Sequence, residues 1–325
     1  MRCRSGRPPL PPTRKVERGT VRTVPARRVP ALLAAAALVA LALTGCTAAT
    51  SASCVQPGDA SRLVRASGSF GSPTVSFPKP LHSSTLQKSV IKQGDGATIS
   101  DGQLVVGKVA YYDGATGKPL GDPGETDLVA GADTSGNSTV PGLQKAMACS
   151  TVGSRIAVTG TVKQVFSDPS QLGVPSDTTM VFVFDLTKAF PSRATGDPRP
   201  AQPGMPTVVL APNGQPGIKI PSHDAPTTLG SAVLKQGSGA TITAKDEILV
   251  NYTAVAWNNP DTVASSSWQS GSPVVWPDTS GQSYSPPAAA LKRLVGEKVG
   301  SQIIVVTPGS DATAIVIDIL GIWKR

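Results

Sequence analysis

Histidine, cysteine and aromatic residues are scarce in this chain. Its 325 residues include two histidines and four cysteines, and Phe, Trp and Tyr together account for 4%. The sequence contains no Ser/His/Asp set, no zinc-ligand spacing and no phosphate-binding glycine loop. Both histidines, His82 and His223, lie in proline-flanked segments, where we expect solvated side chains. The sequence therefore predicts no metal, no cofactor and no covalent catalyst.

Charged residues are also few, at 16%, although the formal net charge is +9. Residues 1–45 contain nine basic side chains and a single acid, Glu17, so this segment alone carries +8. From Cys46 onward the net charge is only +1. A nearly neutral folded part has no electrostatic reason to bind polyanions, which excludes nucleic acid as an expected partner.

No apolar run is long enough to span a bilayer comfortably. The run from Ala31 to Leu43 follows a basic region that ends at Arg27 and Arg28, as in a signal peptide. LTGC at 43–46 resembles the lipobox of bacterial lipoproteins, which implies cleavage after residue 45 and a diacylglycerol on Cys46. We therefore expect an extracytoplasmic protein that is lipid-anchored to the cell membrane. The alternative is an ordinary cleaved signal followed by a chance cysteine.

Two cysteines are left once Cys3 leaves with the leader and Cys46 is acylated. These are Cys54 and Cys149. Because an exported protein meets an oxidising compartment, we predict that they form a disulfide bond. Two free thiols are the alternative.

Glycine and proline are abundant, with 33 and 30 residues, which favours short strands joined by turns. The apolar content of 39% is sufficient for two modest cores. Small polar residues predict a flexible tether over 46–68, and the proline-rich run PSRATGDPRPAQPG predicts a linker over 191–204. The expected domains are thus 69–190 and 205–325.

The two expected domains are related by an internal repeat. SVIKQGDGATIS at 89–100 matches AVLKQGSGATIT at 232–243 with a constant offset of 143 residues. Further along, TVGSRIAV at 151–158 matches KVGSQIIV at 298–305. Finally, MVFVFDL at 180–186 corresponds to AIVIDIL at 314–320. Conserved order and approximate spacing indicate a duplicated domain.

Each copy predicts an α+β domain in which strands enclose one short helix. A strand and a Gly-x-Gly turn come first, and an apolar strand, a proline-led helix and a closing apolar strand follow. The expected apolar strands are Leu104–Tyr112 and Ile248–Trp257, the helices Pro141–Cys149 and Pro286–Gly296, and the closing strands Val181–Leu186 and Ile315–Leu320.

This succession of motifs resembles the FKBP-type peptidyl-prolyl cis-trans isomerases, over roughly Phe70 to Arg325. It also resembles actinobacterial lipoproteins with two tandem FKBP-like domains. The resemblance implies two curved antiparallel sheets, each wrapped on a short helix. It further implies catalysed rotation about X-Pro bonds of unfolded or exported polypeptides, whose barrier is about 18–20 kcal/mol. An apolar, water-poor pocket lowers that barrier by favouring the twisted amide.

The pocket residues that the resemblance implies differ between the copies. In the first copy, Val140 and Leu143 in VPGL resemble the pocket floor, and Phe166 and Val174 belong to a long loop that resembles the lid. In the second copy, Tyr252 in NYTA and Trp276 in PVVW are the expected site residues.

The copies also depart from the family pattern. Val263 and Ala264 stand in place of a Phe-Asp pair, Ala290 falls near the floor tryptophan, and the last loop is cut to 309–311. In the first copy, Lys108 is interpreted as the counterpart of Tyr252. Each of these side chains can alternatively be plain core.

Three functions compete on this evidence. The leading hypothesis is a peptidyl-prolyl isomerase or isomerase-like folding factor for exported proteins, with the first copy favoured as the active one. The second is a non-catalytic FKBP-like binding or chaperone module with degenerate pockets. The third, a solute-binding lipoprotein, would need the alternating strands and helices of larger α/β lobes, which this sequence lacks.

Overall fold

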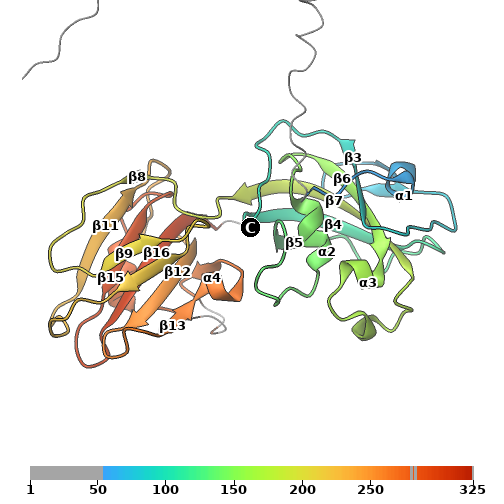
Figure 1. Cartoon of the computed structure of the whole chain (residues 1–325). Coiled ribbons are helices and arrows are strands. Elements are labelled where there is room, and N and C mark those ends of the chain that lie inside the picture. Colours follow the sequence, from blue (N-terminus) through green and yellow to red (C-terminus); the bar gives the residue numbers. More distant parts are fainter. Residues whose placement is uncertain (1–53, 279–280, 282–283, 324–325) are drawn as a thin grey trace, which may run out of the picture. The chain divides into compact units, whose positions relative to one another are not determined.

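The computed structural model describes residues 54–278, 281 and 284–323 (Figure 1). The expected signal peptide and the lipidation site Cys46 lie outside the described residues. Within the described part, no helix combines the length and the apolar character that crossing a bilayer requires. This part is mostly sheet with few and short helices, in agreement with the α+β class.

The first half (residues 54–190) contains a five-stranded antiparallel sheet in the order β3-β6-β7-β4-β5. Its elements are α1 (Asp59–Leu63), β1 (Arg65–Ser67), β2 (Thr74–Ser76), β3 (Gln87–Lys92), β4 (Leu104–Asp113), β5 (Gly124–Val129), α2 (Pro141–Met147), β6 (Arg155–Thr161), α3 (Val162–Val165), η1 (Pro169–Leu172) and β7 (Thr179–Phe190). β1 and β2 form a separate hairpin.

The second half (residues 191–323) contains a seven-stranded sheet in the order β13-β12-β16-β15-β11-β8, with β14 also paired to β12. Its elements are β8 (Asp197–Pro198), β9 (Thr207–Leu210), β10 (Pro216–Lys219), β11 (Gly230–Gln236), β12 (Ile248–Ala256), β13 (Val263–Ser266), α4 (Ser267–Ser270), β14 (Val274–Trp276), α5 (Ala288–Leu291), η2 (Lys292–Leu294), β15 (Gln302–Val306) and β16 (Thr313–Ile322). β9 and β10 form a separate hairpin.

The two sheets repeat one strand order. β3, β6, β7 and β4 neighbour each other as β11, β15, β16 and β12 do. The offset of 143 residues places β3 on β11 and β4 on β12. It also places the hairpin β1–β2 on the hairpin β9–β10, a correspondence that extends the repeat upstream of the matching motifs.

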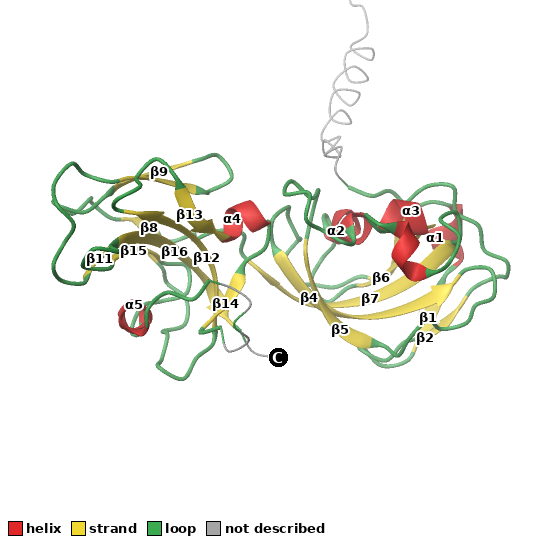
Figure 2. Ribbon diagram, turned by 90° about the horizontal axis from the view of Figure 1, so that it is seen from below, coloured by secondary structure: helices red, strands yellow, loops and turns green. Residues whose placement is uncertain are grey.

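Both faces of each principal sheet are covered, because the closing strands are apolar at consecutive positions. In the first half, Phe182 and Phe184 face α2 and α3, whereas Val181 and Val183 on the opposite face pack with residues of α1 and the hairpin. Figure 2 shows α2 and α3 on one side of the curved sheet. In the second half, Ile304 packs on the same side as the hairpin β9–β10.

A small apolar cluster contains residues from both halves. Leu104 and Phe190 pack with Leu249 and Leu320, and the Phe190 ring stacks on Trp323 with 5.6 Å between the centroids. Gly321 allows this approach, since a Cβ there would run into the Phe190 ring.

The structure differs from the expected tether over residues 54–67. These residues form α1 and β1, with Ala60 and Val64 buried against the first sheet. Their small, polar composition suggested a spacer, but burial of two small apolar side chains and pairing with β2 are enough to order them.

The expected linker at 191–204 also differs in the structure. β8 pairs with β11, and Ala194 is buried with its N–H donated to Asp318 Oδ2 at 2.8 Å. The segment contains little apolar surface, yet it is held by hydrogen bonds from its backbone. Such bonds leave no trace in a hydrophobic pattern.

Candidate functional site

The first half encloses an apolar cavity of about 440 Å³ between its sheet and α2. Aliphatic and aromatic side chains form nearly all of its wall, and none of the lining residues is charged. The lining residues are Val109, Tyr111, Leu120, Thr126, Leu128, Val140, Leu143, Phe166, Val174, Met180, Phe182 and Phe184.

Strand alternation explains how the sheet contributes to the cavity. Residues two apart on a strand share a face, so Val109 and Tyr111 of β4 point to the same side. β5 adds Thr126 and Leu128, and β7 adds alternate residues from Met180 to Phe184. The cavity therefore lies over the concave run of β5, β4 and β7, which are neighbours in the sheet.

Two short helices close the cavity from above. Val140 is the N-cap of α2, Pro141 occupies its first turn, and Leu143 follows on the buried side. Gly142 permits α2 to approach α3, because a Cβ at this position would overlap the carbonyl oxygen of Gln164. Immediately after α3, Phe166 turns its ring to Phe182, with 6.5 Å between centroids.

The polar groups of the lining are hydroxyls. Tyr111 stacks on Phe182 with 6.3 Å between centroids, and its hydroxyl lies against Gly121, where a Cβ would collide with it. Thr126 supplies the second hydroxyl. A bound amide could thus accept a hydrogen bond within a wall that otherwise excludes water.

The equivalent region of the second half is filled by aromatic side chains. Tyr252 is 4% exposed and Trp276 is fully buried. The Tyr252 ring centroid lies 5.0 Å from that of Trp276 and 5.2 Å from that of Tyr284. Trp276 Nε1 donates to the Tyr284 carbonyl at 2.8 Å, and the Tyr252 hydroxyl lies 2.7 Å from Ser265 Oγ. Burial raises the pKa of Tyr252 and of Tyr284.

The strand register corrects the interpretation of Lys108 as the counterpart of Tyr252. Lys108 lies opposite Asp185, as Asn251 lies opposite Asp318. The residue opposite Phe184 is Val109, and the residue opposite Ile317 is Tyr252. Val109 is thus the counterpart of Tyr252, and the exchange of tyrosine for valine leaves space in the first half.

The structure brings together four of the six residues expected in the site. Val140, Leu143, Phe166 and Val174 all line the apolar cavity. Tyr252 and Trp276 belong to the packed core of the second half. Sequence reasoning missed Tyr111 and Thr126. Period-two alternation with Val109 pointed to Tyr111, but no motif marked β5.

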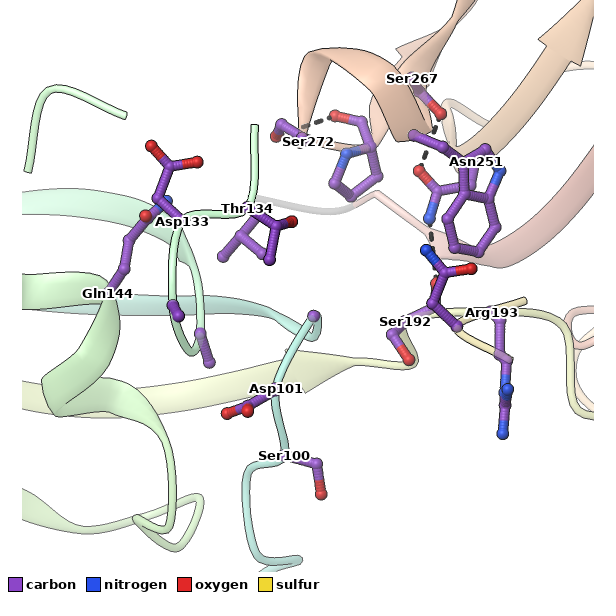
Figure 3. Close-up of a pocket in the computed structure, with 18 residues that line it drawn as sticks. Ser100, Asp101, Asp133, Thr134, Gln144, Ser192, Arg193, Asn251, Ser267 and Ser272 are labelled. Atoms are coloured by element: carbon purple, nitrogen blue, oxygen red, sulfur yellow. Dashed lines mark hydrogen bonds between the residues drawn. The ribbon is translucent and has the colours of Figure 1, made fainter. Parts of the chain in front are cut away.

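A second cavity, of about 510 Å³, is polar and has residues of both halves in its wall (Figure 3). Its hydroxyl and amide groups bind one another: Ser267 Oγ donates to Asn251 Oδ1 at 2.8 Å, and Asn251 Nδ2 donates to the Ser192 carbonyl at 3.0 Å. Hydrogen bonds, led by that from the Ser138 backbone, lower the pKa of Asp133. Polar walls of this kind do not favour a desolvated prolyl ring.

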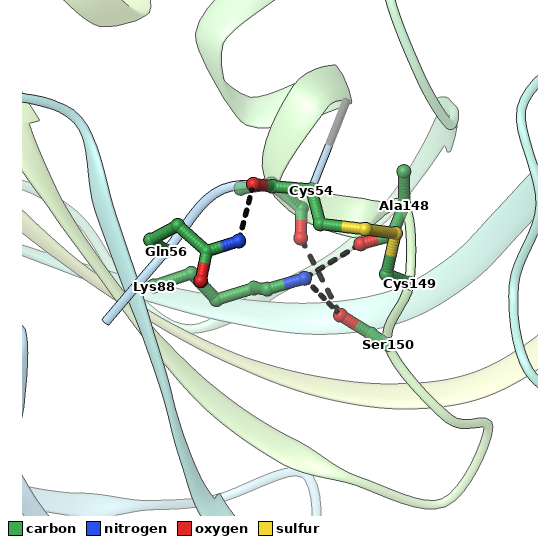
Figure 4. The surroundings of a disulfide bond; sticks show 7 residues. Cys54, Gln56, Lys88, Ala148, Cys149 and Ser150 are labelled. Carbon is green, nitrogen blue, oxygen red and sulfur yellow. Dashed lines mark hydrogen bonds between the residues drawn. A yellow bond between two sulfur atoms is a disulfide. The ribbon is translucent and has the colours of Figure 1, made fainter. Parts of the chain in front are cut away.

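Cys54 and Cys149 form a disulfide bond in the structure, with 5.8 Å between their Cα atoms (Figure 4). It joins the start of the described chain to the end of α2. Beside it, Lys88 Nζ donates to the Ala148 carbonyl at 2.6 Å and to Ser150 Oγ at 3.1 Å. Burial lowers the pKa of Lys88 to about 8.

Comparison with known proteins gives structural neighbours only. No family model matches the chain, and no curated protein matches it. The similar solved structures are FKBP-domain proteins.

One of these is the three FKBP domains of wheat FKBP73, with 14% identity over 74% of this chain and 95% of that chain, at a TM-score of 0.30. FkpA from Escherichia coli has 18% identity over 33% of this chain and 49% of that chain, at 0.27. The N-terminal domain of FKBP42 from Arabidopsis thaliana has 16% identity over 37% and 98%, at 0.28. At these TM-scores we derive function from the cavity instead.

Proposed function

We propose that the protein is a peptidyl-prolyl cis-trans isomerase of the FKBP-like kind, with two domains in tandem, and that the first half is the active one. The observation that carries this proposal is the apolar cavity of about 440 Å³, whose wall has two hydroxyls and no charge. The proposed substrates are unfolded, exported polypeptides that contain proline.

The chemistry needs no nucleophile. Rotation about the X-Pro C–N bond disrupts amide resonance, so the twisted amide is less polar than the planar one. A water-poor wall of Leu143, Phe166 and Phe182 favours the twisted form over the planar form, which is binding energy directed at the transition state. The Tyr111 hydroxyl, which lies at the cavity wall, can donate to the substrate carbonyl and hold one side of the rotating bond.

The proposed location follows from the leader and from the disulfide. A lipid on Cys46 would anchor the protein outside the cytoplasmic membrane, where its clients emerge. A bond between Cys54 and Cys149 supports an oxidising compartment, since cytosolic proteins rarely keep structural disulfides.

Exchange NMR on a Leu-Pro peptide tests the enzymatic proposal without a coupling protease. The decisive variant is Val109→Tyr, which places in the first half the side chain that fills the second. We expect kcat/KM to fall at least about tenfold, since a filled cavity cannot admit the prolyl ring. Val209→Thr, at a position 68% exposed in the second half, is the control and keeps the wild-type rate. A Val109→Tyr protein that is folded and fully active would contradict the proposal.

A second function is favoured by the closed core of the second half. Tyr252, Trp276 and Tyr284 leave it without an equivalent cavity in the described residues, so that half would act as a binding or chaperone module. The test is suppression of aggregation of an unfolded client by the Val109→Tyr protein. Suppression with no isomerisation would assign the whole chain to this class.

A further inference from the structure

β5 is the last strand of the first sheet and forms one wall of the apolar cavity. Within the described residues it pairs with β4 alone, from Gly124 opposite Val109 to Val129 opposite Leu104 (Figure 2). An edge strand presents backbone N–H and C=O groups that can pair with another extended chain.

The geometry of an added strand places its side chains over the cavity. A chain paired along β5 would lie about 4.8 Å from it, with alternate side chains on the face of Thr126 and Leu128. Those two residues line the cavity. A proline is tolerated on such an outer strand when its missing N–H would have faced solvent. The prolyl ring can therefore enter the cavity while the flanking residues pair with β5.

The opposite face of β5 is acidic. Glu125 and Asp127 alternate with the cavity-lining residues and are exposed, and Asp122 is exposed just before the strand. Residues 122–129 include three acids and no base. Alternation also means that the residue immediately before a cavity-bound proline projects to the face of Glu125 and Asp127.

We propose that the edge of β5 docks extended, proline-containing segments in which a lysine or arginine precedes the proline. The proposal rests on the proposed isomerase function and adds its substrate class. The basic side chain would pair with Glu125 and Asp127, while the prolyl ring occupies the cavity. The charge selects the segment, and the apolar wall acts on the bond.

The test compares Lys-Pro, Leu-Pro and Glu-Pro peptides of otherwise identical sequence by exchange NMR. We expect kcat/KM for Lys-Pro to exceed that for Glu-Pro by about tenfold at low ionic strength, with the ratio falling as salt screens the exposed acids. In the double variant Glu125→Gln with Asp127→Asn, the ratio falls towards one and the Leu-Pro rate stays unchanged.

A matched control removes two other exposed acids. Asp95→Asn with Asp261→Asn changes the net charge equally, far from β5, and should preserve the ratio. Strand pairing is checked separately by amide hydrogen exchange on the wild-type chain saturated with the Lys-Pro peptide. We expect slower exchange at alternate amides of β5.

The outcomes separate the two proposals. Equal rates for Lys-Pro and Glu-Pro, or a ratio that survives the Glu125→Gln and Asp127→Asn changes, overturn the docking proposal and leave the isomerase standing. Unprotected β5 amides overturn strand pairing. If no peptide is isomerised, the isomerase proposal fails and the substrate proposal fails with it.

Discussion

Two buried aspartates occupy the same register position in the two halves but meet different partners. Asp185 accepts from Arg155 Nε at 2.6 Å and from Nη2 at 2.8 Å, and it also accepts from the Gly71 N–H. Asp318 accepts from Gln302 Nε2 at 2.7 Å and from the Ala194 N–H. The first carboxylate is paired with a full charge, whereas the second has only neutral donors.

Asparagine at these positions should therefore have opposite effects on the free energy of unfolding. Asp185→Asn leaves the buried Arg155 without its countercharge and should cost about 3 kcal/mol. Asp318→Asn should be neutral or stabilising by up to about 1 kcal/mol, since Gln302 can turn its amide to accept from the new side chain. Urea unfolding followed by circular dichroism at neutral pH measures both. Equal losses in the two variants would contradict this account.

Asp318 also gives a pH dependence with a defined sign. Burial raises its pKa in the folded state, although hydrogen bonds from Ala194 and Gln302 oppose the shift. Between the ordinary pKa of an aspartate and this raised pKa, the folded state binds more protons than the unfolded state. The contribution of Asp318 to stability therefore declines as pH rises through that window, and Asp318→Asn should abolish this decline.

Lys88 predicts an increase of stability on the alkaline side. Its folded pKa is about 8 against an ordinary value of 10.5, so between these pH values the unfolded chain binds the extra proton. Stability should thus rise with pH across this window, by at most about 1.4 kcal/mol for each unit. Urea midpoints from pH 7.5 to 10.5 measure the rise, and Lys88→Met should flatten it. A wild-type midpoint that falls smoothly over this range would refute the assignment.

At the level of elements, the contact of α2 with α3 sets the roof of the cavity. Gly142→Ala forces α2 away from the Gln164 carbonyl, because its Cβ has no room. We expect a loss of about 1–3 kcal/mol in stability and a loss of isomerase activity, since Val140 and Leu143 move with the helix. Gly217→Ala, whose Cβ would meet only the Val209 carbonyl at 3.5 Å, is the control for both measurements. An active and stable Gly142→Ala protein would show that the roof adapts.

The strands with strong hydrophobic patterns were predictable from sequence. β4, β12, β7 and β16 appear within a few residues of the expected ranges, and VPGL gave the start of α2. The hairpin β1–β2 was not predictable, since its six residues are mostly polar and half-exposed. Arg155 holds the turn by donating to the carbonyls of Ser67, Gly68 and Ser69, contacts that span more than 80 residues.

The site was predictable in part for the same reason. Val140, Leu143, Phe166 and Val174 belong to motifs, and the structure gathers them around one cavity. The opening itself depends on Val109 standing where Tyr252 stands in the other half, which only the register of paired strands reveals. Sequence alignment by eye placed Lys108 there because no residue pattern distinguishes neighbouring positions of a fully apolar strand.

At the scale of the whole molecule, the two halves can be followed separately by spectroscopy. All four tryptophans, Trp257, Trp268, Trp276 and Trp323, belong to the second half. The disulfide lies entirely in the first half and joins residues 95 positions apart. Tryptophan fluorescence therefore reports one half and the disulfide constrains the other.

Removing the disulfide should destabilise the first half alone. Closing a loop of about 95 residues restricts the unfolded chain and is worth roughly 4–5 kcal/mol in the chain-entropy treatment. Cys54→Ser with Cys149→Ser should lower the urea midpoint seen by hydrogen exchange in β6 and β7, and leave the tryptophan transition unchanged. Equal shifts of both signals would mean that the apolar contact of Phe190 with Trp323 makes the halves unfold as one unit. That outcome is distinguished by Phe190→Ala, which would then split the single transition into two.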